Sequence, residues 1–491
     1  MIHISDCNKF RKCVIQYVKQ KNAGPSEFIP FIRLDEQVSD LVKQKLKIED
    51  CFTGQKRDDT SLAMNAMQEY DWLVQARFEY KGLRVKVPFM HRTEDGWDVY
   101  FLLIGLFPHR DRVQYYADTL WVLQGLGISV HNVLIAHLNS EYVRGEELDV
   151  DQLFMISDVI YNNNNHPSVS AYQSAMDSVR DLEPLIEQMN SIDENNLPEP
   201  KRTIRCTGRN KCKFYDECFQ EEKNVPDNSI LTLMTSQHRY EMHKAGIERL
   251  RDADPEKLEG TRQQYSQIMA DRNGGLFFDR LALKSWLSNI TYPITCLDFE
   301  WERFAIPPYK GMKPYDVLPF EYSLHIMYED GHTDHKVYLS FRDDRRDMAE
   351  HLVKDIPADG TVLAFNAEGA EKMRISEFAE QFDDLSEKLL NINERMEDLE
   401  LPFEIGTVYH LGMRGLWSLK KIMSLMNDRS YKELDIQEGM SAVFEWRQLD
   451  SNEPTENREE IIENLKEYCG MDTYAMTVVY RWLVSLVSDE N

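Results

Sequence analysis

The sequence predicts an α/β fold built from two regions of mixed helices and strands. In both halves of the 491-residue chain, segments with helical apolar spacing alternate with runs of β-branched and aromatic residues. A polar stretch with two prolines at 191–200 and a change of pattern between 252 and 289 divide the chain. We therefore expect three parts, with residues 1–220 and 290–491 as domains and 221–289 as a helical connector.

The composition excludes several classes of protein. No apolar run approaches the roughly 18 residues that a membrane helix needs, and the amino terminus lacks a basic-then-apolar leader. We expect a cytoplasmic protein without membrane contact. The formal net charge of −27 argues against an evenly basic surface but is compatible with one basic groove.

The first region predicts an α/β core. Apolar spacing predicts helices over 10–18, 62–80 and 112–126. Residues 83–89, 97–104 and 130–138 are rich in β-branched and aromatic side chains and are predicted as strands.

The second region predicts a ribonuclease-H-like sheet. A buried-type strand over 292–299 is followed by two strands, 322–328 and 335–341, around the turn Glu329-Asp330-Gly331. A strand is then predicted over 361–365, and helices over 345–353, 369–382, 418–426 and 459–487. Three antiparallel strands followed by strands that alternate with helices are typical of that sheet.

Two acids stand at i and i+2 on the first strand of this region. Asp298 and Glu300 therefore point to one face, whereas Leu297 and Phe299 point to the other. Converging carboxylates repel each other unless a cation lies between them, so this pair predicts a divalent-metal site.

Two later segments offer further ligands. Tyr468 and Asp472 are four residues apart on a predicted helix, so they share one face. The strand that ends at 365 continues into Asn366, Glu368 and Glu371 where a helix begins. Glu371 is the preferred third acid because the first turn of a helix favours a carboxylate, and Glu368 remains the alternative.

These three motifs resemble those of the DEDD (DnaQ-like) 3′→5′ exonucleases, in their tyrosine-bearing subtype. The family has an Asp four residues after the Asn, whereas Glu371 stands five residues after Asn366. The resemblance implies that Asp298, Glu300, Glu371 and Asp472 hold two Mg²⁺ or Mn²⁺ ions and that Tyr468 orients the attacking water.

Three cysteines, Cys206, Cys212 and Cys218, lie within thirteen residues. Such a cluster predicts a metal site with a fourth thiolate from Cys7 or Cys13. The spacing suits zinc and an iron-sulfur cluster equally well.

An amino-terminal cysteine, a nuclease-like core and a late cysteine triplet resemble RecB-type PD-(D/E)XK nucleases that carry a [4Fe-4S] cluster. That resemblance implies Cys13 as the fourth ligand. The family's catalytic Asp, Glu and Lys are replaced by Lys86, Phe101 and Leu103. We therefore interpret residues 1–220 as a pseudonuclease whose groove serves as a nucleic-acid or partner surface.

The whole chain is similar to an uncharacterised bacterial family that joins these two kinds of domain, with segments 137–144 and 418–420 carrying the likeness. The resemblance implies a metal-dependent 3′→5′ exonuclease that acts on DNA rather than RNA, because RecB-type relatives act on DNA. The alternative is a catalytically weak or inactive nucleic-acid-binding or assembly protein that keeps both nuclease folds, with possible protein partners.

Overall fold

The computed structural model describes residues 2–22, 32–207, 211–222, 224–426, 431, 434–436, 439–450 and 457–488. Its contacts divide the chain into two compact units. The first unit comprises Met1–Gln220 and Phe304–Asp316, and the second comprises Glu221–Arg303 and Val317–Asn491. Residues 221–289, the predicted connector, fall within the second unit.

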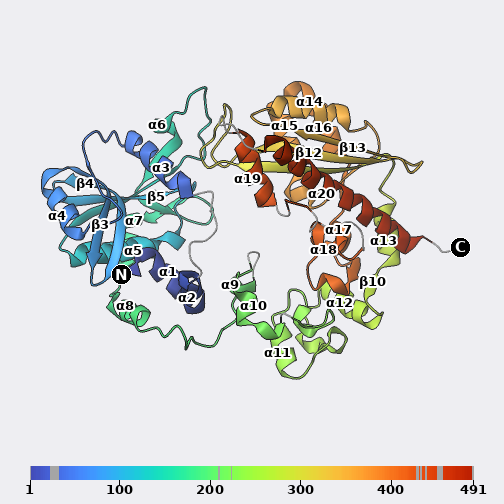
Figure 1. Cartoon of the computed structure of the whole chain (residues 1–491), viewed down its shortest axis with the longest axis horizontal. Helices are drawn as coiled ribbons and strands as arrows, with labels where there is room; N and C mark the ends of the chain where they lie inside the picture. Colours follow the sequence, from blue (N-terminus) through green and yellow to red (C-terminus); the bar gives the residue numbers. More distant parts are fainter. Residues whose placement is uncertain are drawn as a thin grey trace. The chain divides into compact units, whose positions relative to one another are not determined.

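A seven-stranded mixed sheet forms the middle of the first unit (Figure 1). Its strands follow the order β2-β3-β4-β5-β6-β7, and β1 pairs with β4 in parallel. The strands are β1 (Ile2–His3), β2 (Phe52–Thr53), β3 (Trp72–Tyr80), β4 (Leu83–Thr93), β5 (Gly96–Leu103), β6 (Val130–Leu138) and β7 (Phe154–Ser157), and a separate hairpin joins β8 (Val159–Tyr161) to β9 (Pro167–Ser170).

Apolar clusters bury both faces of this sheet. On one face Val85 and Val87 pack with helices α1, α4, α5 and α7, and on the other Phe89 packs with Val38 and Val42 of α3. The helices are α1 (Ile4–Lys12), α2 (Val14–Asn22), α3 (Ile32–Lys45), α4 (Thr60–Glu69), α5 (Val113–Gly125), α6 (Val150–Leu153), α7 (Ala171–Ser178), α8 (Glu183–Asn190), α9 (Ile204–Thr207) and α10 (Tyr215–Cys218).

The predicted helix over 62–80 is wrong in its second half, where the chain forms β3. Gln75 has a φ of 51°, and the strand's alternation changes there. Leu73 and Ala76 consequently pack in the same core cluster although they are three residues apart, whereas Val74 packs in the cluster on the opposite face. Buried residues three apart imitate helical spacing, which explains the error.

The second unit is built on a five-stranded sheet with the order β13-β12-β11-β14-β15. β11 pairs with β12 in antiparallel fashion and with β14 in parallel, and β14 pairs with β15 in parallel. The bounds are β11 (Ile294–Arg303), β12 (Val317–Met327), β13 (Thr333–Leu339), β14 (Thr361–Ala364) and β15 (Met396–Asp398), with β10 (Leu276–Phe278) and β16 (Val408–His410) as a separate pair.

Helices cover both faces of this second sheet. α14, α15 and α16 pack on the face that carries Leu297, Phe299 and Leu324, and the long α20 crosses the other face (Figure 1). The helices are α11 (Arg239–Lys244), α12 (Arg262–Arg272), α13 (Arg280–Leu287), α14 (Arg345–Asp355), α15 (Glu371–Gln381), α16 (Asp383–Glu394), α17 (Leu401–Glu404), α18 (Leu419–Met423), α19 (Gly439–Asp450) and α20 (Arg458–Val487).

The mixed α/β architecture is confirmed, but five described α-helices and strands within residues 290–491 are additional to the prediction: α16, β15, α17, β16 and α19. Because β11, β14 and β15 are parallel, their carboxyl ends meet at one sheet edge, where ligands bind in open α/β sheets. Within the described residues, no helix is both long and apolar enough to cross a bilayer.

Candidate metal centre

Acids from β11 and α20 converge at the sheet of the second unit. One carboxylate oxygen from each of Asp298, Glu300 and Asp472 lies within 4.8 Å of the other two. An octahedral magnesium ion binds oxygens at about 2.1 Å, which places ligand oxygens roughly 3 to 4 Å apart. The three acids therefore fit a hard divalent cation, and an ion could be accommodated with small side-chain shifts.

α20 is held against this face by a buried polar contact and a close approach. The hydroxyl groups of Thr473 and Ser323 are hydrogen-bonded at 2.8 Å. A Cβ atom at Gly470 would lie 3.0 Å from Cε1 of His335, so this position leaves little room for a side chain. The two contacts fix the helix register that brings Asp472, next to Thr473, to β11.

The acids are electrostatically frustrated in this arrangement. Burial raises the pKa values of Asp298 and Glu300 well above their ordinary range, and the charge of Asp472 raises both further. Burial raises the pKa of Asp472 to about 6, although the Tyr431 hydroxyl and the Lys420 ammonium oppose this shift. A bound cation would relieve the repulsion and favour the ionised forms.

Glu371 is not one of the three acids whose oxygens lie within 4.8 Å of one another, but its charge acts on them. It begins α15 and is 2% exposed, and its Oε2 atom has no hydrogen-bond partner among the described residues. Burial raises its pKa to about 8, and the charges of Asp398 and Asp472 act in the same direction. The charge of Glu371 in turn raises the pKa of Asp298, so the structure brings Glu371 into the same electrostatic cluster.

Glu368, the alternative third acid, lies elsewhere. Its side chain is 76% exposed and forms an ion pair with Lys372 at 2.5 Å. The structure therefore directs this carboxylate to solvent.

Asp398, at the end of β15, shapes the loop that precedes Glu371. Its two carboxylate oxygens accept hydrogen bonds from the backbone N–H groups of Asn366 and Ala367, each at 3.0 Å. A third bond comes from the N–H of Glu400 at 2.8 Å. Asp398 thereby stabilises the left-handed Asn366, whose φ is 67°, and with it the turn that leads to α15.

A lysine and two tyrosines complete the surroundings of Asp472. Lys420 donates to the hydroxyl oxygen of Tyr468 at 2.9 Å, and the Tyr431 hydroxyl donates to Oδ1 of Asp472 at 2.6 Å. Burial raises the pKa of Tyr468, and the charges of Asp472, Glu300 and Asp298 raise it further, so Tyr468 is a neutral phenol. Sequence reasoning missed the roles of Lys420 and Tyr431.

Another buried acid lies across the strand pair from the site. Glu321 of β12 is directly opposite Glu300 and is fully buried, and neither of its carboxylate oxygens has a hydrogen-bond partner among the described residues. Burial raises its pKa to about 8, an effect that Lys466 reduces. Glu321 is therefore mainly protonated at neutral pH.

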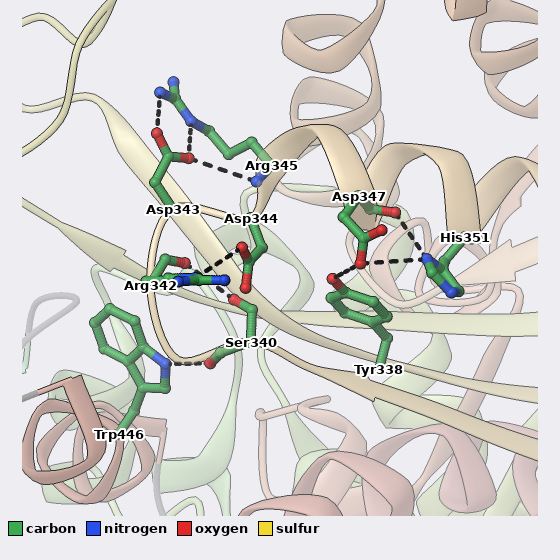
Figure 2. Close-up of polar contacts among 9 residues, drawn as sticks. All are labelled: Tyr338, Ser340, Arg342, Asp343, Asp344, Arg345, Asp347, His351 and Trp446. Atoms are coloured by element: carbon green, nitrogen blue, oxygen red, sulfur yellow. Dashed lines mark hydrogen bonds and ion pairs between the residues drawn. The ribbon is translucent and has the colours of Figure 1, made fainter.

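α19 begins beside the metal centre. A Cβ atom at Gly439 would lie 3.7 Å from Oε2 of Glu300 and 3.9 Å from the Tyr468 hydroxyl. Farther along α19, the indole N–H of Trp446 donates to the carbonyl of Ser340 at 2.7 Å (Figure 2). This bond fixes α19 to the end of β13, close to the Asp343–Arg345 ion pair that precedes α14.

The predicted thiol ligands are close enough to influence one another. Burial raises the pKa of Cys218, Lys19 opposes the shift, and Cys13, Cys212 and Cys206 raise it further. Among the described residues, no three of these sulfurs lie within 4.8 Å of one another, whereas a single zinc ion would hold thiolates about 3.8 Å apart.

Cys7, the alternative fourth ligand, is not among the thiols that raise the pKa of Cys218. It is fully buried in the apolar core of the first unit, where burial raises its pKa to about 12. Its thiol is therefore placed as a core side chain, and Cys13 is the candidate that the structure brings near the triplet.

The three residues that replace the nuclease signature do not lie together. Lys86 and Leu103 line one cavity of the first unit. Phe101 is 1% exposed and packs in the core, with its ring 4.3 Å from that of Tyr116.

The comparisons with known proteins are limited. A family model described as "Domain of unknown function (DUF2779)" matches residues 295–418, a segment that contains Asp298, Glu300 and Glu371 but not Asp472. No curated protein matches the chain. Among solved structures, the chain is similar to the family B DNA polymerase from the hyperthermophilic archaeon Pyrobaculum calidifontis, with 14% identity and a TM-score of 0.24 over 39% of this chain and 24% of the polymerase chain.

Proposed function

We propose that the second unit is a metal-dependent 3′→5′ exonuclease that hydrolyses phosphodiester bonds of nucleic acid, with DNA as the preferred substrate. The observation that carries this proposal is the convergence of Asp298, Glu300 and Asp472 within 4.8 Å on one side of the sheet. Carboxylates at this spacing bind Mg²⁺ or Mn²⁺, and two such ions would activate a water molecule and stabilise the leaving 3′ oxygen.

The residues of the chain have distinct proposed roles. Asp298 would contact both ions, whereas Glu300 and Asp472 would each hold one. Glu371 would supply the second-motif carboxylate, which its buried and unpartnered Oε2 atom supports. Tyr468 would orient the attacking water through its hydroxyl, which stays protonated in this environment.

The direct test is degradation of oligonucleotides that carry a 5′ label. We expect stepwise shortening from the 3′ end in Mg²⁺ or Mn²⁺, with none in EDTA, on at least one of single-stranded DNA, duplex DNA and the matched RNAs. Asp298→Asn should lower turnover by roughly two to three orders of magnitude, as for other groups that stabilise charge in a transition state. Asp330→Asn, in the exposed turn after β12, is the matched control.

Two results would contradict the proposal. Wild-type protein that binds the oligonucleotides but degrades none of them would favour the alternative, a nucleic-acid-binding or assembly protein. Equal degradation by wild type and Asp298→Asn would show that the acids of β11 are not the catalytic centre.

We also propose that Cys13, Cys206, Cys212 and Cys218 hold a [4Fe-4S] cluster, with zinc as the alternative. The mutual influence of the four thiols supports a shared site. No three of the described thiols lie within 4.8 Å of one another, and a cluster with four iron atoms holds its thiolates farther apart than a single zinc ion does.

The cluster is tested by metal analysis after anaerobic purification. We expect about four irons per chain with broad visible absorption, and stoichiometric zinc without iron would overturn the cluster. Cys212→Ser should lose the metal and lower the melting temperature, because ligation contributes folding free energy. Cys51→Ser, a free cysteine of the same unit, should retain the metal.

A further inference from the structure

The first unit contains a cationic cavity of about 820 Å³. Its walls come from α3, the segment after β2, the strands β3 and β4, the end of β5 and the start of α5. Its lining includes five cationic side chains, Lys56, Arg77, Arg84, Lys86 and Arg112. No acidic side chain is among its lining residues, all of which are described, although the whole chain has a net charge of −27.

Two of these cations are forced together by the sheet. Arg77 of β3 and Lys86 of β4 are directly opposite each other in the antiparallel pairing, so their side chains share one face. Arg84 lies two residues from Lys86 on the same face. Like charges directly opposite each other, as in Arg77 and Lys86, destabilise a strand pair. Arg84 is instead directly opposite the acidic Glu79.

The arginines are oriented by backbone groups. Arg77 donates to the carbonyl of Gln75 at 2.5 Å, and Arg84 donates to the carbonyls of Lys56 and Asp58 at 2.9 and 2.5 Å. Burial and the neighbouring charge of Arg84 lower the pKa of Arg77, whereas Asp58 and Tyr115 act in the opposite direction. These contacts orient the guanidinium groups while leaving their positive charge in place.

The backbone is strained where it forms the cavity wall. Gln75 adopts a φ of 51°, in the left-handed region, opposite Pro88, which has no N–H to donate to the sheet. The Gln75 amide reaches the Ser39 hydroxyl at 3.4 Å, and both residues line the cavity. Such strain is common at binding sites.

The remaining wall is apolar and suits a nucleotide. Leu102, Leu103 and Ile104 line one side, and the ring of Tyr115 lies near the cationic groups. A single phosphate engages two or three cations, so five cations from four segments of the chain match several phosphates. Apolar and aromatic surface beside them matches the sugar and base of the same ligand.

We propose that this cavity binds a single nucleic-acid strand through its phosphate groups and does not cleave it. A metal-dependent nuclease would need carboxylates in this cavity, and none of the described lining residues is Asp or Glu. The proposal is independent of the chemistry assigned to the second unit, because binding can be measured in EDTA.

The experiment is fluorescence anisotropy of the full chain with a labelled oligothymidine, in EDTA, over a range of salt concentrations. We expect Lys86→Ala and Lys56→Ala each to weaken binding several-fold, and Lys86→Glu more than tenfold. Each lost phosphate contact should lower the slope of log Kd against log salt concentration by about 0.7. Both lysines are exposed, so the melting temperatures should not fall.

Lys244→Ala is the matched control. Lys244 is exposed on α11 in the second unit, and its substitution removes the same positive charge. Variants of Lys86 and Lys56 with the affinity and salt slope of this control would overturn the proposal. Thymidine monophosphate that competes as strongly as the oligonucleotide would also overturn it, in favour of a mononucleotide site.

Discussion

The ammonium group of Lys420 donates a hydrogen bond to the hydroxyl oxygen of Tyr468 at 2.9 Å. This contact occupies a lone pair of the phenol, so the phenolic proton points away from the lysine. The same ammonium lies 4.7 Å from the centre of the Tyr468 ring and lowers the pKa values of Glu300 and Asp472. Lys420 is therefore a positioning residue that also adjusts the charge of the acids.

Separate substitutions of Lys420 and Tyr468 should distinguish the positioning of the Tyr468 hydroxyl from the effect of the Lys420 charge on the acids. Tyr468→Phe removes the hydroxyl but keeps the ring, so we expect kcat to fall roughly 10- to 100-fold with little change in KM. Lys420→Met should also lower kcat, and it should move the acidic limb of the kcat/KM profile to higher pH because the acids lose a stabilising cation.

The pH profile of the degradation reaction measures this difference. Lys421→Met, one residue along α18, serves as the control and should keep the wild-type profile. A Lys420→Met profile that coincides with the wild type would contradict the charge effect, whatever the loss of kcat.

The second-motif acid can be tested by paired substitutions. Glu371→Gln should abolish turnover and preserve oligonucleotide binding, because it removes a buried ligand charge from the metal centre. Glu368→Gln should cost less than about tenfold, or about 1.4 kcal/mol of activation free energy, because its carboxylate is in solvent beside Lys372. Steady-state turnover and anisotropy binding give the ranking, and the reverse ranking would reassign the ligand.

Glu321 should make the protein less stable as the pH rises. Its pKa in the folded protein is about 8, above the ordinary value of 4.5. Between these values the folded protein binds more protons at this site than the unfolded chain does, so unfolding becomes easier with rising pH. The loss is on the order of 4 kcal/mol by pH 8.

Thermal unfolding of Glu321→Gln in EDTA checks this expectation. The neutral amide cannot ionise, so the variant should melt close to wild type at pH 5 and above it at pH 8. Glu329→Gln, in the exposed turn after β12, controls for the loss of a carboxylate. Parallel melting curves for Glu321→Gln and wild type across this range would refute the role of Glu321 ionisation.

Where the prediction from sequence failed, the cause was long-range structure. The reversal of faces at Gln75 made a strand resemble a helix. Asp398 lies in the acidic stretch 394–400, whose composition is typical of a solvated face or loop, yet it accepts three backbone hydrogen bonds. Nothing in the local pattern distinguishes Asp398 from its acidic neighbours Glu397 and Glu400.

The sequence by itself determined that Asp298 and Glu300 share a face and that Tyr468 and Asp472 do so as well, because strand and helix periodicity are local properties. Only the tertiary structure decided that Asp472 meets Asp298 and Glu300, that the charge of Glu371 acts on Asp298 whereas Glu368 is in solvent, and that Lys420 contacts Tyr468. Burial and hydrogen bonding depend on residues that are distant in the chain, and the packing of α18 and α20 on the sheet brings them together.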